Sequence, residues 1–268
     1  MYELKEKRSL EAPPRFKRPS LVASAGWLVF ALLIGLGVKG AELTFSRLGS
    51  GVVNMGHFIA RAFPPDPTRF GPIMARILET FEIALVGTVI GVIASIPVAL
   101  LCSRNTCSNL FIRTAVKSAV SAMRTIPDLI WALIFVISIG LGPLAGILTI
   151  AVDTIGFCAR FFSERIEEME KGPAEALESA GASQFGIIAG AILPAGLPSF
   201  VGTSLYSIEK SIRSAVILGL VGAGGIGVEL STAMSLRKFD EALMIILMIL
   251  VVVIGVEQVS SRIRKRVI

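Results

Sequence analysis

The fold is decided by the apolar stretch IALVGTVIGVIASIPVALL, which runs from Ile83 to Leu101 without an ionisable residue. A helix rises ~1.5 Å per residue, so about 20 apolar residues cross the ~30 Å hydrocarbon core of a bilayer. Lipid offers no partner for unpaired backbone groups, and a helix satisfies its own N–H and C=O groups. The stretch therefore predicts a membrane-spanning helix.

Five further stretches have the same character, at residues 21–38, 126–139, 143–162, 197–220 and 242–259. The one that starts at residue 126 is short for a span unless the approach from Lys117 to Arg124 is also helical. The sequence therefore predicts an all-α membrane protein with about six transmembrane helices.

Composition agrees with a membrane protein. Of 268 residues, 53% are hydrophobic and 17% are charged, and the mean hydropathy of +0.76 lies outside the range of soluble domains. Three cysteines do not make a disulfide framework, and the single histidine, His57, lies far from any cysteine in the chain. We expect no catalytic residue, no metal site and no bound cofactor on this chain.

Both ends of the chain are basic, within an overall charge of +6. Cytoplasmic segments of membrane proteins are enriched in Lys and Arg, so we expect both termini in the cytoplasm and an even number of spans. Neither basic end interleaves aromatic residues with its charges, which favours an orientation signal over a nucleic-acid site. The expected organisation is a cytoplasmic tail (1–20), a first transmembrane helix (21–40), an extracytoplasmic loop (41–77), a core of five helices (78–260) that includes a cytoplasmic loop (164–194), and a second cytoplasmic tail (261–268).

Two parts of the chain contain a regular pattern of glycines. The first is the segment 222–227, which fits G-x-G-x-x-G and contains Gly222, Gly224, Gly225 and Gly227. A dinucleotide site needs a short strand, a turn, an amphipathic helix and a second strand that ends in an acidic residue, whereas Asp240 here precedes a long apolar stretch instead of ending one. We instead expect a tight turn or close packing at the outer end of the fifth span. In the second span, Gly87, Gly91 and Ser95 recur every four residues and predict a helix-packing face.

Polar residues form a broad stripe on the fifth span. The candidates for lining a translocation path are Tyr206, Ser207, Glu209, Lys210, Arg213 and Ser214. Charges in the middle of a span are expected to face protein or water. Glu209 and Arg213 are spaced i,i+4, so a purely structural ion pair is the alternative, and it leaves Lys210 as a net positive charge. For Asp153, Arg124 and Asp128, pairing between helices or snorkelling at helix ends is the alternative to contact with a substrate.

The cytoplasmic loop carries Glu175-Ala176-Leu177-Glu178-Ser179-Ala180-Gly181, with Leu193-Pro194 further on, and Gly172-Pro173 just before it indicates a helix start. Here the sequence resembles the membrane permease subunits of ABC importers, although Leu177 replaces the second alanine of their EAA signature and Ala191 stands in place of a larger aliphatic residue. The resemblance implies a type I importer fold and a coupling helix that docks on an ATPase. The residues to which it assigns coupling are Gly172, Pro173, Glu175, Ala176, Glu178 and Gly181.

Phe63-Pro64-Pro65-Asp66 and the segment from Arg213 to Gly227 resemble the phosphonate-importer permeases. This implies a homodimeric pathway in the lipid of a bacterial inner membrane, with a solute-binding protein outside and two ATP-binding subunits inside that use ATP and Mg²⁺. The chain has no phosphate-binding loop of its own.

Permeases for phosphite, a phosphate ester, methionine or a sulfonate are alternative functions. A membrane enzyme is another, but Asp128 and Asp153 have no supporting histidine. A channel would need a filter-like loop.

Overall fold

The computed structural model describes residues 20–41 and 44–267, so most of the expected N-terminal tail lies outside the described residues. Every regular element in these two ranges is a helix, which confirms the all-α prediction. The elements are α1 (Leu21–Gly40), α2 (Phe45–Ala62), α3 (Phe70–Cys102), α4 (Leu110–Thr125), α5 (Asp128–Ile139), α6 (Pro143–Glu168), α7 (Gly172–Ser179), α8 (Gln184–Ile187), the π-helix η1 (Ile188–Ile192), α9 (Leu193–Gly219), α10 (Ile226–Ser235) and α11 (Phe239–Val267).

The chain divides into two compact units, residues 1–58 and residues 59–268. The first unit contains α1 and most of α2. Ser20 begins α1, because its hydroxyl oxygen accepts the Ala23 N–H at 3.2 Å, as in an N-cap. None of the side chains of α1 is buried, as expected of a helix whose surroundings are lipid.

In the part of the chain that the structure describes, five helical runs are long and apolar enough to cross a membrane: α1, α3, α6, the run Gln184–Gly219 that joins α8, η1 and α9, and Phe239–Lys265 within α11. The sixth expected span is different, because α4 and α5 meet the same test only as a pair bent by 92°. α5 has 12 residues and is only ~18 Å long, too short to cross alone. The bend falls at Ile126-Pro127, where proline disfavours a helical conformation in the residue before it.

Three segments predicted as loops or tails are helical. The loop 41–77 contains α2 and the first turns of α3, the segment between the last two spans contains α10, and α11 continues through the tail 261–268 as far as Val267. These helices are amphipathic or short, so a search for uniformly apolar stretches passes over them.

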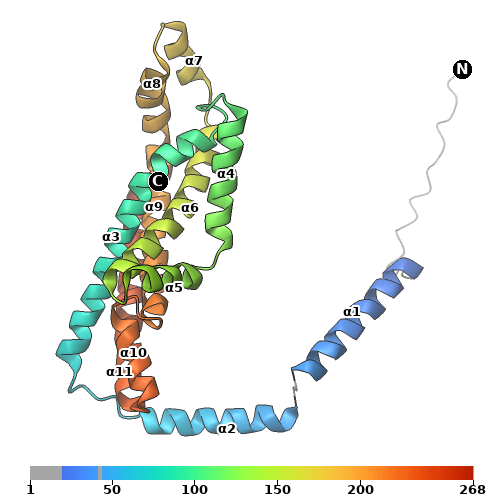
Figure 1. Cartoon of the computed structure of the whole chain (residues 1–268), viewed down its shortest axis with the longest axis vertical. Coiled ribbons are helices and arrows are strands. Elements are labelled where there is room, and N and C mark those ends of the chain that lie inside the picture. The colour runs from blue at the N-terminus through green and yellow to red at the C-terminus, as the bar shows by residue number, and fades with distance from the viewer. Residues whose placement is uncertain (1–19, 42–43, 268) are drawn as a thin grey trace, which may run out of the picture. The chain divides into compact units, whose positions relative to one another are not determined.

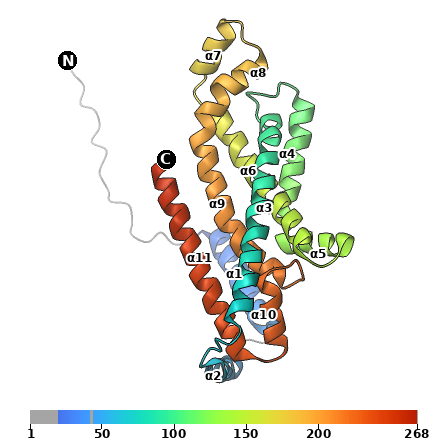
Figure 2. The ribbon, with the colours of Figure 1, turned by 90° about the vertical axis from the view of Figure 1, so that its left-hand side faces the viewer.

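The second unit is a bundle in which α3 packs along α6, with α9 and α11 beside them (Figure 1). Figure 2 shows that α5 turns away from the direction of the bundle. A Cβ atom added to Gly87 would lie 2.8 Å from the Ile150 Cβ, and one added to Gly91 would lie 2.5 Å from the Thr154 Cβ. Both approaches are too close for any side chain, which confirms the predicted packing face on α3.

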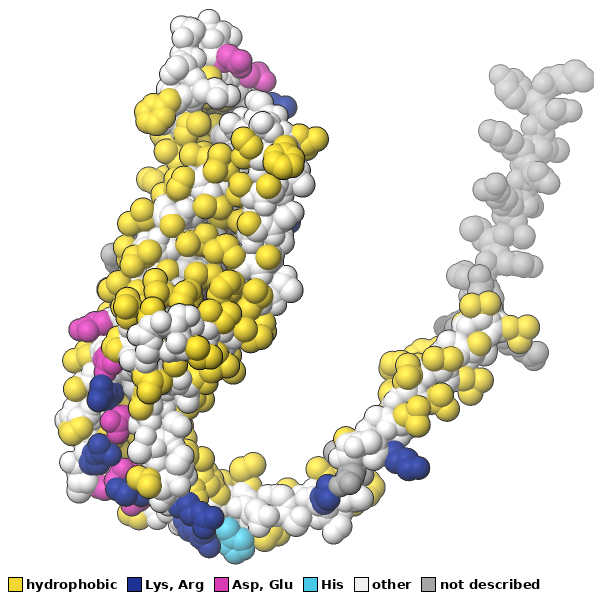
Figure 3. All heavy atoms as spheres, viewed as in Figure 1, with side chains coloured by type: hydrophobic (Ala, Val, Ile, Leu, Met, Phe, Trp, Pro, Cys, Tyr) yellow, Lys and Arg dark blue, Asp and Glu magenta, His cyan; other side chains and the backbone are white. Residues whose placement is uncertain are grey.

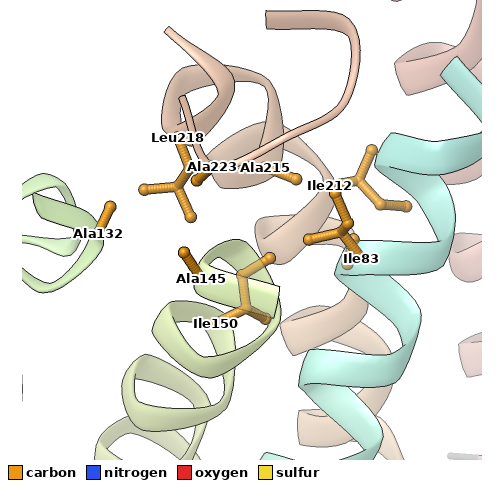
Figure 4. Close-up of a cluster of buried hydrophobic side chains, with 9 residues drawn as sticks. Ile83, Ala132, Ala145, Ile150, Ile212, Ala215, Leu218 and Ala223 are labelled. Carbon is orange, nitrogen blue, oxygen red and sulfur yellow. The ribbon is translucent and has the colours of Figure 1, made fainter. Parts of the chain in front are cut away.

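A core of small and β-branched side chains lies where α3, α5, α6 and α9 meet (Figure 4). Ile83, Ile150, Ile212 and Leu218 fill it, and alanines such as Ala145 allow the backbones to come close. This core fixes the position of the middle of α9, on which the polar stripe lies.

The two ends of the second unit are polar. In Figures 1 and 2, α7 and α8 form one end, whereas α10 and the first turns of α3 and α11 form the other. Figure 3 shows apolar side chains over most of the surface between these ends, and charged side chains gathered towards the ends. An apolar belt between two polar ends is the surface expected of a protein that crosses a bilayer.

The packing face gives a first prediction. Gly91→Ala should lower the free energy of unfolding by about 1–3 kcal/mol, because its methyl group overlaps Thr154 in a close-packed interface. Gly71→Ala in the same helix is the matched control, since a Cβ there has no neighbour within 4 Å. Thermal unfolding of the purified protein in detergent measures both. Equal stability of the two variants would contradict the close approach of α3 and α6.

Candidate functional site

The centre of the polar stripe on α9 is Glu209, which is 7% exposed. Its carboxylate forms ion pairs with two arginines: Arg213 Nη2 lies 3.2 Å from Oε1, and Arg264 Nη2 donates to Oε2 at 3.0 Å. The first contact is the i,i+4 pair predicted from the sequence. The second comes from α11, whose final turns also place the Ser260 hydroxyl 3.4 Å from the Leu205 carbonyl oxygen. Glu209 therefore joins α9 to α11.

Lys210 has a partner, contrary to the prediction that it is left as a net positive charge. Its Nζ donates to both carboxylate oxygens of Asp153 on α6, at 2.8 and 2.7 Å. The ammonium also lies 5.2 Å from the ring centroid of Phe157, within the range of a cation–π contact. Of the alternatives considered for Asp153, pairing between helices is the one observed.

The remaining candidates have different surroundings. The Ser214 hydroxyl donates to Asp128 Oδ2 at 3.0 Å, which connects α9 to α5. The Tyr206 ring lies 5.7 Å from the Phe157 ring and is partly exposed. Ser207 is buried, and its hydroxyl lies 3.5 Å from that of Thr154. Ser207 thus faces α6 and is not on the exposed side of the stripe.

The exposed side of this stripe carries charge within an apolar bundle. The Arg213 side chain is 45% exposed and that of Lys210 is 32% exposed, although both have carboxylate partners. Lipid does not accommodate such charges near the middle of a span, so this face must meet water or protein. We refer to Asp128, Asp153, Glu209, Lys210, Arg213 and Arg264 as the charge network.

The network holds three cations and three carboxylates, so it has no excess positive charge to attract an anion. Arg213 Nη2 and Lys210 Nζ already face Glu209 and Asp153, so an anionic solute would use the N–H donors that these ion pairs leave over on the exposed side. Within residues 20–41 and 44–267, no group of three or more His, Cys, Asp or Glu side chains is arranged to hold a metal ion.

Sequence reasoning missed the contribution of α11. Arg264 belonged to the expected basic tail, but α11 continues without a break and carries Arg264 back to Glu209. A signal was present: Ser260 and Arg264 are spaced i,i+4 on an amphipathic continuation of the last apolar stretch.

The predicted coupling residues lie in and just after α7, at one end of the second unit (Figure 1). Pro173 is in the first turn, where its missing N–H costs no hydrogen bond. Gly181 ends the helical turn with a φ of +80°, and a Cβ there would have no neighbour within 4 Å. No side chain of α7 is buried. The helix is therefore an exposed element, held to the bundle by its two flanking segments.

Behind α7 is a cavity of about 290 Å³, between this helix and the α8–η1 segment. Glu170, Glu175 and Glu178 line it together with apolar side chains such as Ile188. Leu177 comes so close to η1 that a Cβ at Gly190 would lie 3.2 Å from its Cδ1 atom. Leu177, the departure from the EAA signature, thus packs inward against η1.

The glycine motif forms the turn from α9 into α10. Gly222, Gly224 and Gly225 have φ values of +88°, +86° and +75°, a conformation that glycine adopts without strain. At Gly227, an added Cβ would lie 2.1 Å from the Val216 carbonyl oxygen. The glycines therefore allow the chain to turn tightly and to pack closely against the end of α9.

The N–H groups of this turn are occupied by α3. The Gly225 N–H donates to Glu79 Oε1 at 3.2 Å, and the Ile226 N–H donates to the Thr80 hydroxyl oxygen at 2.7 Å. In a dinucleotide site these positions would face a pyrophosphate. Here they attach the start of α10 to α3.

A second cluster of ion pairs lies at the end of the second unit where α10 is located. Arg69 contacts Glu229 on α10 at 3.3 Å and Glu241 on α11 at 3.2 Å. The Glu241 carboxylate, followed by the charge of Glu229, raises the pKa of the Arg69 guanidinium above its usual value. Lys238 also contacts Glu241, at 2.8 Å. The cluster joins the starts of α3, α10 and α11.

This combination of spanning helices, a buried charge network and an exposed end helix defines a multi-pass membrane transport protein. Residues 76–268 match the family described as binding-protein-dependent transport system inner membrane component. The chain belongs to this family, and it is a permease of an ABC importer.

Two relatives of this chain are described as permeases for phosphite or phosphate. The phosphite transport system permease protein PtxC of Stutzerimonas stutzeri is 32% identical over 223 residues, which cover 83% of this chain and 81% of the relative. The phosphate-import permease protein PhnE of Mycolicibacterium smegmatis is 35% identical over 209 residues, which cover 78% of this chain and 39% of the relative.

Solved structures show the same fold. A chain of the MetNI methionine ABC transporter, in an inward-facing conformation, has a TM-score of 0.65 and 22% identity, with 75% of this chain and 99% of that chain covered. A chain of a bacterial ABC transporter that imports the acidic polysaccharide alginate has a TM-score of 0.58 and 17% identity, with 90% and 97% covered. The fold is that of type I importer permeases, as the sequence predicts.

Proposed function

We propose that this chain forms the transmembrane pathway for a phosphonate or a related phosphorus oxyanion such as phosphite. The observation that carries the proposal is the exposed side of the α9 stripe, where Lys210 and Arg213 present N–H donors within an apolar bundle. The names of the relatives, which refer to phosphite and phosphate transport, support this class of solute. An oxyanion passing this face would exchange hydrogen bonds with water for hydrogen bonds with these two cations.

A second copy of the chain completes the pathway in this proposal. The charged face cannot meet lipid, and a two-fold dimer would bring two such faces together around a shared aqueous passage. The apolar surface around the rest of the bundle would remain in contact with the membrane (Figure 3).

Energy and solute come from other proteins in this proposal. The exposed helix α7 would dock on an ATP-binding subunit in the cytoplasm, and two such subunits would hydrolyse ATP with Mg²⁺. A solute-binding protein would deliver the ligand to the opposite side, where the cluster around Arg69 lies. The chain's two termini would then lie in the cytoplasm, and the chain itself would carry out no catalysis.

The test is reconstitution of the chain in liposomes with its candidate ATPase and binding protein, followed by ATP hydrolysis and uptake measurements. We expect methylphosphonate or phosphite to stimulate hydrolysis and to accumulate in the vesicles, and the chain without the ATPase to transport neither. Stimulation by methionine alone would overturn the solute class and keep the transport function. Full transport by the chain without the ATPase would overturn the proposed coupling.

A further inference from the structure

The helix α2, which precedes the matched family region, has two opposite faces. Five of its apolar residues recur at intervals of three or four and form one face, namely Phe45, Leu48, Val52, Met55 and Ile59, whereas Val53 and Phe58 lie outside this face. Its polar residues follow the same intervals and are Arg47, Ser50, Asn54, His57 and Arg61. Helical periodicity places these two sets on opposite sides. Each of the five apolar side chains exposes half or more of its surface.

Chain connectivity keeps both ends of α2 close to a membrane surface. Only residues 41–44 separate it from the spanning helix α1, and residues 63–69 separate it from the spanning helix α3. Fully extended, these connections reach at most ~14 Å and ~25 Å. Because α2 itself is ~27 Å long, a helix tethered so closely at both ends lies along the membrane more readily than it projects from it.

The connection after α2 is also fixed to the second unit. The Asp66 N–H donates to the Asp240 carbonyl oxygen at 3.4 Å. The Thr68 backbone N–H donates to the Asp66 carboxylate at 2.8 Å and lowers the pKa of Asp66. Ala62, the last residue of α2, is buried. The C-terminal end of α2 is therefore anchored at the end of the bundle where α3 begins.

We propose that α2 is an interfacial helix, with its apolar face inserted among the lipids of the outer leaflet and its cationic face on anionic headgroups. The helix has Arg47 and Arg61 but no acidic residue, which complements a negatively charged lipid surface. The choice of the outer leaflet rests on the proposed function, which places α7 in the cytoplasm at the opposite end of the bundle. The contact with lipid does not depend on that function.

The test uses the full chain in vesicles of phosphatidylethanolamine and phosphatidylglycerol, without ATPase or solute. Cys102, Cys107 and Cys158 are replaced by alanine, and single cysteines carrying a nitroxide label are introduced on each face. The apolar-face set is Leu48→Cys, Val52→Cys and Met55→Cys, and the polar-face set is Ser50→Cys, Asn54→Cys and His57→Cys. Collisions with oxygen, which partitions into lipid, are compared with collisions with a water-soluble nickel chelate.

We expect the apolar-face labels to collide preferentially with oxygen, at a depth of about 5–10 Å, and the polar-face labels to collide preferentially with the nickel chelate. Uniform access of the chelate to both faces would overturn the proposal. Protection of the apolar face from both reagents would also overturn it, because that face would then be covered by protein. Nickel chelate confined to the vesicle exterior or interior, in vesicles of known protein orientation, identifies the leaflet.

A charge placed on either face gives a matched control. Val52→Glu should move the Leu48→Cys label towards water, whereas Asn54→Glu should leave its oxygen preference unchanged. Equal effects of the two substitutions would count against insertion of one face. A failure here would leave solute-stimulated ATP hydrolysis intact, so it is distinguishable from a failure of the proposed transport function.

Discussion

Gly181→Val should reduce solute uptake by about tenfold or more while the protein still inserts and folds. The glycine has a φ of +80°, where an L-residue loses roughly 1–2 kcal/mol and a β-branched residue is still less tolerated. No atom lies within 4 Å of the added Cβ, so the cost comes from the backbone and not from packing. The strain would be relieved by changing how α7 ends, which would alter the surface proposed to dock on the ATPase.

The conservative variant Gly181→Asn separates conformation from side-chain bulk, since asparagine tolerates a left-handed backbone. We expect it to recover most of the uptake lost in Gly181→Val. The measurements are co-purification of the ATPase, ATP hydrolysis and uptake in the same vesicles. Normal uptake and ATPase association in Gly181→Val would contradict the coupling role of this segment.

Glu209→Met should have the second large effect, a loss of folded protein. Removing this carboxylate takes away the shared partner of Arg213 and Arg264. Breaking a fully buried ion pair by removing one partner costs about 3–5 kcal/mol, and we expect a value at or below the lower end here, because the Arg213 and Arg264 side chains are 45% and 27% exposed. Thermal unfolding and the yield of monodisperse protein in detergent measure this effect.

A triple variant tests whether the network also acts in transport. With Glu209, Arg213 and Arg264 all replaced by methionine, no uncompensated charge remains at this place, so stability should largely return. Uptake of a phosphorus oxyanion should stay low, because Arg213 no longer offers N–H donors to the solute. Recovery of uptake together with stability would reduce the three residues to a structural role.

The sequence predicts contacts within one helix far better than contacts between helices. The Glu209–Arg213 pair and the packing face at Gly87 and Gly91 follow from helical periodicity alone, and both are confirmed. The Lys210–Asp153 pair depends on the relative register of α9 and α6, which no local pattern encodes. The predicted net positive charge at Lys210 was therefore wrong, because Asp153 on α6 supplies the opposite charge.

Segments of mixed polarity were also difficult to predict. The apolar stretches located the spans but not their ends, since α3 starts at Phe70 instead of Ile83 and α11 ends at Val267 instead of Val259. The helices α2 and α10 and the end of α11 were missed because they are not uniformly apolar. The third span is preceded by a sharp bend at Ile126-Pro127, because proline disfavours a helical conformation in the residue before it. The sequence therefore predicted too little helix outside the apolar stretches.

The equal number of cations and carboxylates in the charge network bears on the energy source of the cycle. Moving one uncompensated charge through the membrane potential involves about 2.3 kcal/mol per 100 mV. In a group where Lys210 moves with Asp153, and Arg213 with Glu209, these electrical contributions largely cancel. Voltage across the bilayer then gives little bias to either conformation, and the direction of transport is left to the nucleotide cycle.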